Sequence, residues 1–265
     1  VLRLNWLTAA LLGAGLGPVL AQVPGQTLPT GFQAPRPDAP VTTSTSGTTM
    51  TIEQPQQRGI AHWDSFSIGN DATVIVKQPN ASSVLLNRVI WNDGFPLSEI
   101  NGALTANGHV YLINPGGVLF GPDAQINVGG IVASTLDLAG ATVGERNDRF
   151  VNDGALEFAS EGAGAARVEV GEGAVIRSGA GSGGMVVLLG GRIENRGTLD
   201  APGGTVALGV GDRITLDPVG DGLTTLRIDE GSFAESAVGI LNDAGALITA
   251  DGGRVLLLAR SAYGT

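Results

Sequence analysis

The chain has no cysteine, only two histidines, and few aromatic residues, which make up 5% of its 265 residues. The absence of cysteine excludes disulfides, thiolate metal sites and thiol nucleophiles. Basic residues are also few, since 15 Lys and Arg stand against 25 Asp and Glu for a formal net charge of −10. Nucleic acid is therefore not expected as a partner, because phosphate binding depends on clustered Lys and Arg.

Long apolar runs are absent beyond Ala21. The segment up to this residue starts with one basic side chain, continues with an apolar run and ends in Val19-Leu20-Ala21, where signal peptidase would read the −3 and −1 positions. The run is too short and too rich in glycine to span roughly 30 Å of hydrocarbon. The sequence therefore predicts a secretory signal over residues 1–21, cleaved between Ala21 and Gln22.

Glycine is in excess, with 42 residues, about twice its usual share of roughly 7%. Residues 22–48 are rich in Pro, Thr, Ser and Gly, and are expected to form an extended, poorly ordered lead-in. From residue 49 onward, short alternating runs of β-formers are separated by Gly, Asn and Asp. No window of a dozen residues carries an apolar stripe of 3.6-residue period, so an all-β fold is predicted. The clearest predicted strands are residues 73–76, 167–170, 205–208 and 225–229.

A repeat emerges when the glycines that precede the strands are aligned. The relevant glycines are Gly102, Gly173, Gly197 and Gly245. To within one residue, the three intervals between them are three times, once and twice 24 residues. A regular rung of about 24 residues with several short strands predicts a β-solenoid of about nine rungs from residue 49 onward. Sandwiches and barrels place turns about every 8 to 12 residues and have no such register.

Five ordered blocks between residues 58 and 135 point to one family. The most informative block contains the turn Asn114-Pro115-Gly116-Gly117 between runs of apolar β-formers. Together the blocks resemble the N-terminal secretion domain of two-partner-secretion exoproteins of the filamentous-haemagglutinin type, where this turn is usually Asn-Pro-Asn-Gly. Gly116 replaces the second Asn, and the turn is still expected because glycine enters left-handed conformations freely. The blocks are residues 58–69, 78–80, 86–89, 100–108 and 113–121 with 126–135.

The resemblance implies a right-handed parallel β-helix that acts as a secretion module. The Sec machinery moves such a chain into the periplasm, and an outer-membrane β-barrel transporter then binds it through periplasmic POTRA domains. The chain folds outside, so the protein is expected to be secreted or held at the cell surface, as part of an adhesin or haemagglutinin. The same resemblance places transporter recognition around Asn80, Asn87, Asn114, Pro115 and Gly117, with turn-building as the alternative role.

The β-helical secretion domain is expected to cover residues 49–265 and to continue beyond them. Residues 254–259 form a fresh apolar strand, and no polar capping unit follows it. Repeat proteins normally close such an end, because unpaired strand edges recruit other chains.

Two other functions stay open. The solenoid would be an adhesin module if it bound a host-cell receptor or glycan directly, and aromatic side chains would be its usual anchors. A β-helical polysaccharide lyase or hydrolase would instead need carboxylates that converge on one face. The candidate anchors are Trp63, Trp91, Tyr111 and Tyr263. The candidate carboxylates are Asp200, Asp217, Asp229 and Asp251, whose irregular spacing favours turn-forming roles.

No catalytic, metal or cofactor site is expected. His62 and His109 belong to no cluster of His or Cys, whereas tetrahedral zinc needs three or four ligands. The segment Gly179-x-Gly181-x-x-Gly184 matches the dinucleotide fingerprint, but it leads into a strand and not into the helix that would hold a pyrophosphate. The chain is thus expected to be a secretion and recognition module and not an enzyme.

Overall fold

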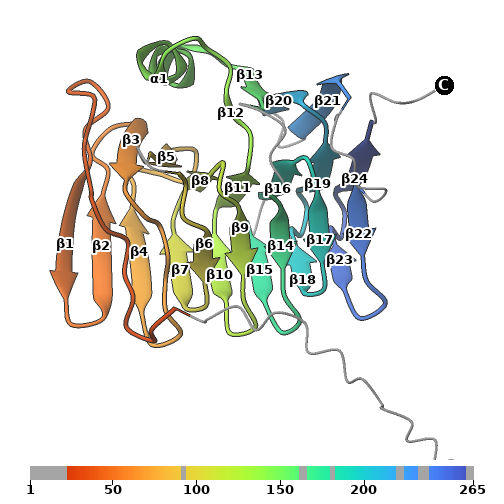
Figure 1. Ribbon diagram of the computed structural model, residues 1–265, viewed down its shortest axis with the longest axis horizontal. Helices are drawn as coiled ribbons and strands as arrows, with labels where there is room; N and C mark the ends of the chain where they lie inside the picture. Colours follow the sequence, from red (N-terminus) through yellow and green to blue (C-terminus); the bar gives the residue numbers. More distant parts are fainter. Residues whose placement is uncertain are drawn as a thin grey trace, which may run out of the picture.

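The structure, a computed structural model, describes residues 23–90, 94–160, 166–179, 183–218, 224–231 and 239–260. They form a parallel β-helix with three sheets, which confirms the predicted fold class (Figure 1). The signal segment with Ala21 and Gln22 lies outside the described residues, as do Trp91 and Tyr263. Within the described ranges, no helix is both long enough and apolar enough to cross a membrane.

A complete rung contributes one strand to each of three sheets in turn, while the first and last described rungs have no strand in sheet 3. Sheet 1 contains β1 (Thr42–Ser46), β2 (Thr49–Glu53), β4 (Thr73–Lys77), β7 (Ala103–Ala106), β10 (Gln125–Val128), β15 (Val175–Ser178), β18 (Thr198–Asp200) and β23 (Leu247–Thr249). Sheet 2 contains β3 (Arg58–Trp63), β5 (Val84–Val89), β8 (His109–Ile113), β11 (Gly130–Ser134), β16 (Met185–Gly190), β19 (Thr205–Val210) and β24 (Arg254–Ala259). Sheet 3 contains β6 (Ser98–Ile100), β9 (Val118–Phe120), β14 (Val168–Val170), β17 (Ile193–Asn195) and β22 (Ile240–Asn242).

A smaller, antiparallel sheet lies outside the solenoid, together with the helix α1 (Val143–Asn152) (Figure 1). Its strands are β12 (Asp137–Leu138), β13 (Leu156–Ala159), β20 (Arg213–Pro218) and β21 (Thr224–Glu230). These elements come from two insertions. Each insertion leaves the solenoid after a strand of sheet 2 and returns to it in sheet 3.

The insertions explain why the predicted number of rungs is wrong. Thr49 pairs with Thr73, so an uninterrupted rung has the predicted length. Gln125 pairs with Val175, and Thr198 of β18 pairs with Leu247 of β23, so each of these two steps is close to twice that length. Each insertion is about as long as one rung, and the glycine spacing therefore stays near multiples of 24. In the described part of the chain, sheet 2 contains seven strands instead of the expected nine.

Sheet 2 is mostly apolar on both faces. Its strands β16 and β19 are buried at every position, as expected for near-continuous apolar runs in a covered parallel sheet. One face fills the solenoid with stacked side chains such as Val110, Ile131 and Val186. The opposite face, with Tyr111 and Val132, packs against the elements outside the solenoid. The insertions therefore bury a sheet face that would otherwise be exposed.

The helix α1 was not predicted from the sequence. It buries only Asn147 and Phe150, so it has no broad apolar stripe. An N-cap nevertheless marks its start: the Glu145 N–H donates to Oγ1 of the N-cap Thr142 (3.2 Å), and the Glu145 carboxylate accepts from the N–H of Ala141, the residue before the cap (2.9 Å). The Thr-x-x-Glu pattern is the sequence signal for this helix.

The expectation of a poorly ordered lead-in is wrong for the described residues 23–48. The Gln33 N–H donates to the His62 carbonyl, and the His62 N–H donates back to Gln33, both at 2.9 Å. Phe32 also packs on Trp63 with ring centroids 5.2 Å apart. This segment covers the outer edge of β3, while β1 pairs antiparallel with β2. The first rung is thus capped, which removes an edge that could pair with other chains.

Candidate functional site: the Asn114 turn and its surroundings

Asn114 holds the corner between sheets 2 and 3 together. Its side chain is fully buried. Its Nδ2 donates to the Pro96 carbonyl (2.7 Å) and to Ser98 Oγ (2.8 Å), and its Oδ1 accepts from the Gly116 N–H (2.8 Å). The Gly117 N–H donates to the Asn114 carbonyl (3.0 Å), which closes a β-turn. One side chain therefore links this turn to the preceding segment 94–98.

The left-handed conformation expected of Gly116 is adopted by Gly117 instead. Gly117 has φ +115°, whereas Gly116 does not adopt a left-handed conformation. Glycine is needed at 116 for space, because a Cβ there would overlap the Phe95 carbonyl oxygen and lie 2.7 Å from the Phe95 Cβ. The backbone of segment 94–98 thus occupies the volume that an asparagine side chain would need in the usual family turn.

Asn80 lies in an exposed turn at the corner between sheets 1 and 2. Its Oδ1 accepts from the N–H and Oγ of Ser82 (3.0 and 2.8 Å), and its Nδ2 donates to Gln57 Oε1 (3.0 Å). The Ser83 N–H donates to the Asn80 carbonyl (3.2 Å). Unlike Asn114, this side chain is accessible in the folded domain.

Asn87 does not belong to a turn, contrary to the turn-building alternative. It lies in β5, opposite Ala61 on one side and Leu112 on the other, so its side chain is part of the solenoid interior. Its Oδ1 accepts from Trp63 Nε1 (3.1 Å), one rung away. The side chain is fully buried. The amide satisfies the indole N–H, which burial would otherwise leave without an acceptor.

The five predicted recognition residues therefore do not form one surface. Asn80 is exposed and Pro115 is half-buried, whereas Asn87, Asn114 and Gly117 are buried. They also lie at two different corners and in the solenoid interior. A partner could reach all five only before the rungs have stacked.

A buried charge network was missed in the sequence. The Arg88 guanidinium, on β5, donates through Nε to Asp137 (2.9 Å) and also to the Asn147 side chain of α1. Arg146 donates to the other Asp137 oxygen (2.8 Å). Arg88 and Asp137 side chains are 1% and 5% exposed. The network links α1 and β12 to sheet 2. The sequence signal for it was Arg88 within an apolar strand pattern, because a buried arginine is nearly always paired.

Neither histidine forms part of a metal or acid–base site in the described structure. His62 Nε2 lies 3.4 Å from Arg88, and its pKa is lowered to about 4, first by burial and then by the Arg88 charge. Burial likewise lowers the pKa of His109. Among the described residues, no group of three His, Asp or Glu side chains could hold a metal ion. Gly179 precedes the strand β16, so the dinucleotide pattern lacks the helix it requires.

The residues proposed for the alternative functions do not come together either. Trp63 is fully buried and Tyr111 is 2% exposed, so neither can stack on a glycan. Of the four candidate carboxylates, Asp217 and Asp229 lie in the outer sheet, while Asp200 and Asp251 lie on the solenoid. Hydrogen bonds from Thr249 and Arg177 lower the pKa of Asp200, which keeps it ionised and unsuited to acid catalysis.

Comparison with known proteins agrees with this architecture. A family model described as the TPS secretion domain matches residues 25–260. The heme/hemopexin-binding protein of Haemophilus influenzae (strain ATCC 51907 / DSM 11121 / KW20 / Rd) is 37% identical over 221 residues, which are 81% of this chain and 22% of that protein. A second Haemophilus influenzae protein of that name is 47% identical over 94 residues, which are 36% of this chain and 10% of the relative. The chain thus spans well under two thirds of either relative.

A solved structure supports the same assignment. The crystal structure of the HMW1 secretion domain from Haemophilus influenzae matches with a TM-score of 0.69 and 27% identity, over 87% of this chain and 57% of that one. The relatives are named as binding proteins and secretion domains and not as enzymes. The chain belongs to the TPS secretion domain family of two-partner-secreted exoproteins, whose members are recognised by an outer-membrane transporter and exported to the medium or the cell surface.

Proposed function

We propose that the periplasmic POTRA domains of the transporter bind this domain before it is folded, after the Sec machinery has delivered it. The observation that carries this proposal is burial. Asn87 and Asn114 are 0% exposed, and their amides bond within the domain. A transporter that reads these side chains must meet them in a chain whose rungs have not yet stacked.

The same side chains are useful to the fold afterwards. A buried amide without partners costs about 1 to 3 kcal/mol, and the native contacts of both asparagines remove that cost. Each strand of sheet 2 pairs only with the strands of neighbouring rungs, so the solenoid can form progressively as the chain leaves the transporter. Folding outside would bury the recognition residues and oppose backward movement.

The test compares two buried asparagines with the same local role. Asn195 is fully buried, accepts from the Gly197 N–H through Oδ1 (3.2 Å) and donates to Asn242 (2.7 Å), much as Asn114 bonds Gly116 and Pro96. Both Asn114→Ala and Asn195→Ala should lower the free energy of unfolding by about 1 to 3 kcal/mol. Secretion is measured in a Gram-negative host that expresses the cognate transporter.

We expect the Asn114 variant to be secreted far less than the Asn195 variant at matched stability, with accumulation in the periplasm. Equal secretion of the two variants would contradict recognition of the turn and would leave Asn114 with an architectural role alone. Urea denaturation of each purified variant supplies the stability comparison.

We further propose that adhesive, haemagglutinating or host-receptor binding activity of the exoprotein lies outside this domain. The support is that the relative is named for binding heme and hemopexin, while the match covers only 22% of its length. A deletion of residues 49–260 should abolish secretion, whereas the purified domain should not agglutinate red cells. Agglutination by the domain alone would place the activity here instead.

A further inference from the structure

The C-terminal end of α1 is held by a side chain of the first rung. The Arg58 guanidinium, on β3, donates to the Phe150 carbonyl (2.6 Å) and to the Asp153 carbonyl (3.4 Å), which lie 92 and 95 positions later in the chain. Carbonyls at the end of a helix lack intrahelical donors, and a positive charge there is favourable. The same guanidinium lies 5.3 Å from the centre of the Phe150 ring, and this ring packs on Tyr111 of β8. Arg58 therefore caps the helix and also covers its main apolar side chain.

Two further arginines of the N-terminal segments reach α1. Arg88 of β5 donates to the Asn147 side chain, 59 positions later, and Arg36 of the lead-in pairs with Asp148, 112 positions later. Together with the contacts to β3 and β8, these bonds join α1 to the lead-in and to three strands that are neighbours in sheet 2 (Figure 1). One short helix therefore connects four segments that are far from it in sequence.

The helix α1 is too short to be stable before it docks. It has 10 residues, fewer than the roughly 12 to 15 at which an isolated helix is even marginally stable in water. It buries only Asn147 and Phe150, so most of its stability must come from its partners. Ile60 and Leu86 share a buried cluster with Phe150 on the outer face of sheet 2. Until the chain is available as far as Asp153, these side chains lack the cover that α1 provides.

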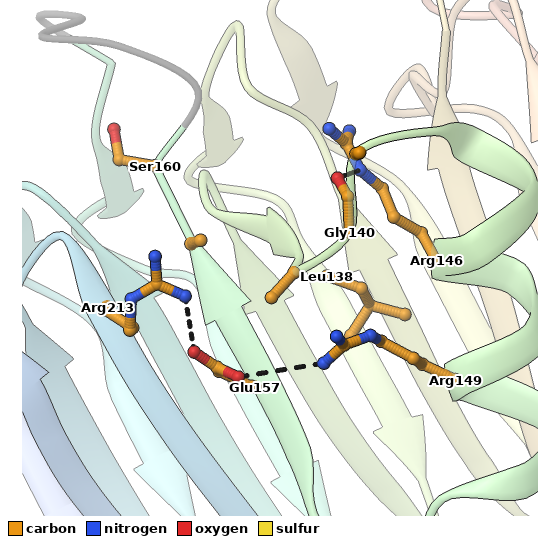
Figure 2. A pocket seen from close by; sticks show the side chains of 10 residues that line it. Leu138, Gly140, Arg146, Arg149, Glu157, Ser160 and Arg213 are labelled. Atoms are coloured by element: carbon orange, nitrogen blue, oxygen red, sulfur yellow. Dashed lines mark hydrogen bonds and ion pairs between the residues drawn. The ribbon is translucent and has the colours of Figure 1, made fainter.

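The opposite side of α1 is joined to the outer antiparallel sheet. Figure 2 shows Glu157 of β13 between Arg149 of α1 and Arg213 of β20. Arg213 donates to one Glu157 oxygen, and Arg149 lies 3.7 Å from the other. The strands β13 and β20 also pair directly. The contacts of α1 therefore extend from the lead-in to the second insertion.

We propose that α1 is a latch, which closes over the first three rungs only when residues 137–153 are outside the membrane together with them, and which then keeps these rungs stacked. Before docking, Arg88 lies on an uncovered sheet face, where water can solvate its charge. After docking, Arg88 and Asp137 are almost fully buried as a pair, and separating such a pair is strongly unfavourable. Closure would thus oppose return of the first rungs to the transporter. The inference depends on export alone and not on which residues the transporter reads.

The test is native-state hydrogen exchange of the purified exported chain, because exchange of protected amides reports local opening. Arg58→Gln removes the cap of α1, and Asp148→Asn weakens its ion pair to the lead-in from the exposed side of the helix. Arg177→Gln is the matched control, since Arg177 pairs with Asp200 on sheet 1 and is not among the residues that contact α1.

The informative amides belong to two groups. Ile60 and His62 of β3 donate to the lead-in and report opening of the first rung. Amides of β16 and β19 lie at the middle of the solenoid and report global unfolding. We expect exchange in β3 and β5 to become about tenfold faster in Arg58→Gln, as loss of a hydrogen bond from a charged donor predicts. In Asp148→Asn it should rise about twofold to fivefold, as for an exposed ion pair.

Exchange in β16 and β19 should stay unchanged in both variants, and Arg177→Gln should leave β3 and β5 unchanged. Equal acceleration in all four strands would overturn the proposal, because α1 would then be only one part of a single cooperative unit. Unchanged exchange of β3 in Arg58→Gln would overturn it as well. If that variant does not fold, unchanged exchange of β3 in Asp148→Asn has the same consequence.

Discussion

Replacing Gly116 with alanine tests the packing of segment 94–98 over the Asn114 turn most directly. The added Cβ would overlap the Phe95 carbonyl oxygen and would lie 2.7 Å from the Phe95 Cβ. Contacts this short do not occur between real Cβ atoms, and backbone cannot rotate away as a flexible side chain can. Segment 94–98 must therefore move away from the turn.

That movement removes the partners of Asn114. Its Nδ2 bonds to Pro96 and Ser98 at 2.7 and 2.8 Å would lengthen or break, which leaves a buried amide unsatisfied at about 1 to 3 kcal/mol. Overpacking itself costs about 1 to 3 kcal/mol in well-packed regions. Alanine restores about 0.4 to 1 kcal/mol, because it restricts the unfolded chain more than glycine does. We expect a net loss of about 1 to 6 kcal/mol.

Urea denaturation of the purified domain measures this loss. Gly154→Ala is the matched control, since a Cβ at Gly154 meets nothing within 4 Å and the residue is not left-handed. That control should change stability by less than about 1 kcal/mol. If the two variants unfold at the same urea concentration, segment 94–98 does not pack on the turn, and the reasoning above is wrong.

Three further predictions concern the core, the pH response and the signal. Asn87→Leu should destabilise the domain by about 1 to 3 kcal/mol because Trp63 Nε1 loses its acceptor, and adding Trp63→Phe should recover part of that loss in a double-mutant cycle. His62 stays neutral in the folded domain, where its pKa is lowered to about 4 from 6.5. The stability that the neutral imidazole contributes to the folded state is therefore complete above pH 6.5 and is lost as the pH falls toward 4. His62→Gln should therefore flatten the decline in urea midpoint between pH 7 and pH 5, and an unchanged decline would contradict this. N-terminal sequencing of the secreted protein should begin at Gln22, and a mature chain that retains Trp6 would refute the predicted signal.

The sequence revealed the fold because strand and turn chemistry repeat locally in every rung. Alternating apolar residues and glycine-containing corners predicted strands such as Thr73–Lys77 and Thr205–Val210 close to where the structure has them. The rung length also followed from spacing. The rung number did not, because each insertion is nearly one rung long and keeps the glycines in phase.

Elements that depend on distant contacts could not be read from local pattern. The helix α1 is held by Phe150 packing on Tyr111, with ring centroids 6.0 Å apart, and by Arg58, which donates to the Phe150 carbonyl (2.6 Å). Neither contact leaves a helical stripe in the sequence. The N-terminal segment before β1 is likewise ordered by pairing with β3 and not by its own composition.

The candidate site was only partly predictable for the same reason. The turn at Asn114 follows from its residue types, but the burial of its side chain depends on segment 94–98 folding back over it. The family resemblance predicts Asn87 as a recognition residue, with turn-building as its alternative role. Its position in β5 becomes clear only when Trp63, one rung earlier, is seen to need an acceptor.

The N-terminal end of the described solenoid is capped, and this cap gives its assembly a direction. At the N-terminal end, the bonds between Gln33 and His62 close the edge of β3. Each new rung can therefore add only on the side away from the cap. Asn87 and Asn114 lie in early rungs of the solenoid, so stacking in this one direction would bury the proposed recognition residues first. Folding and release from the transporter would then reinforce each other.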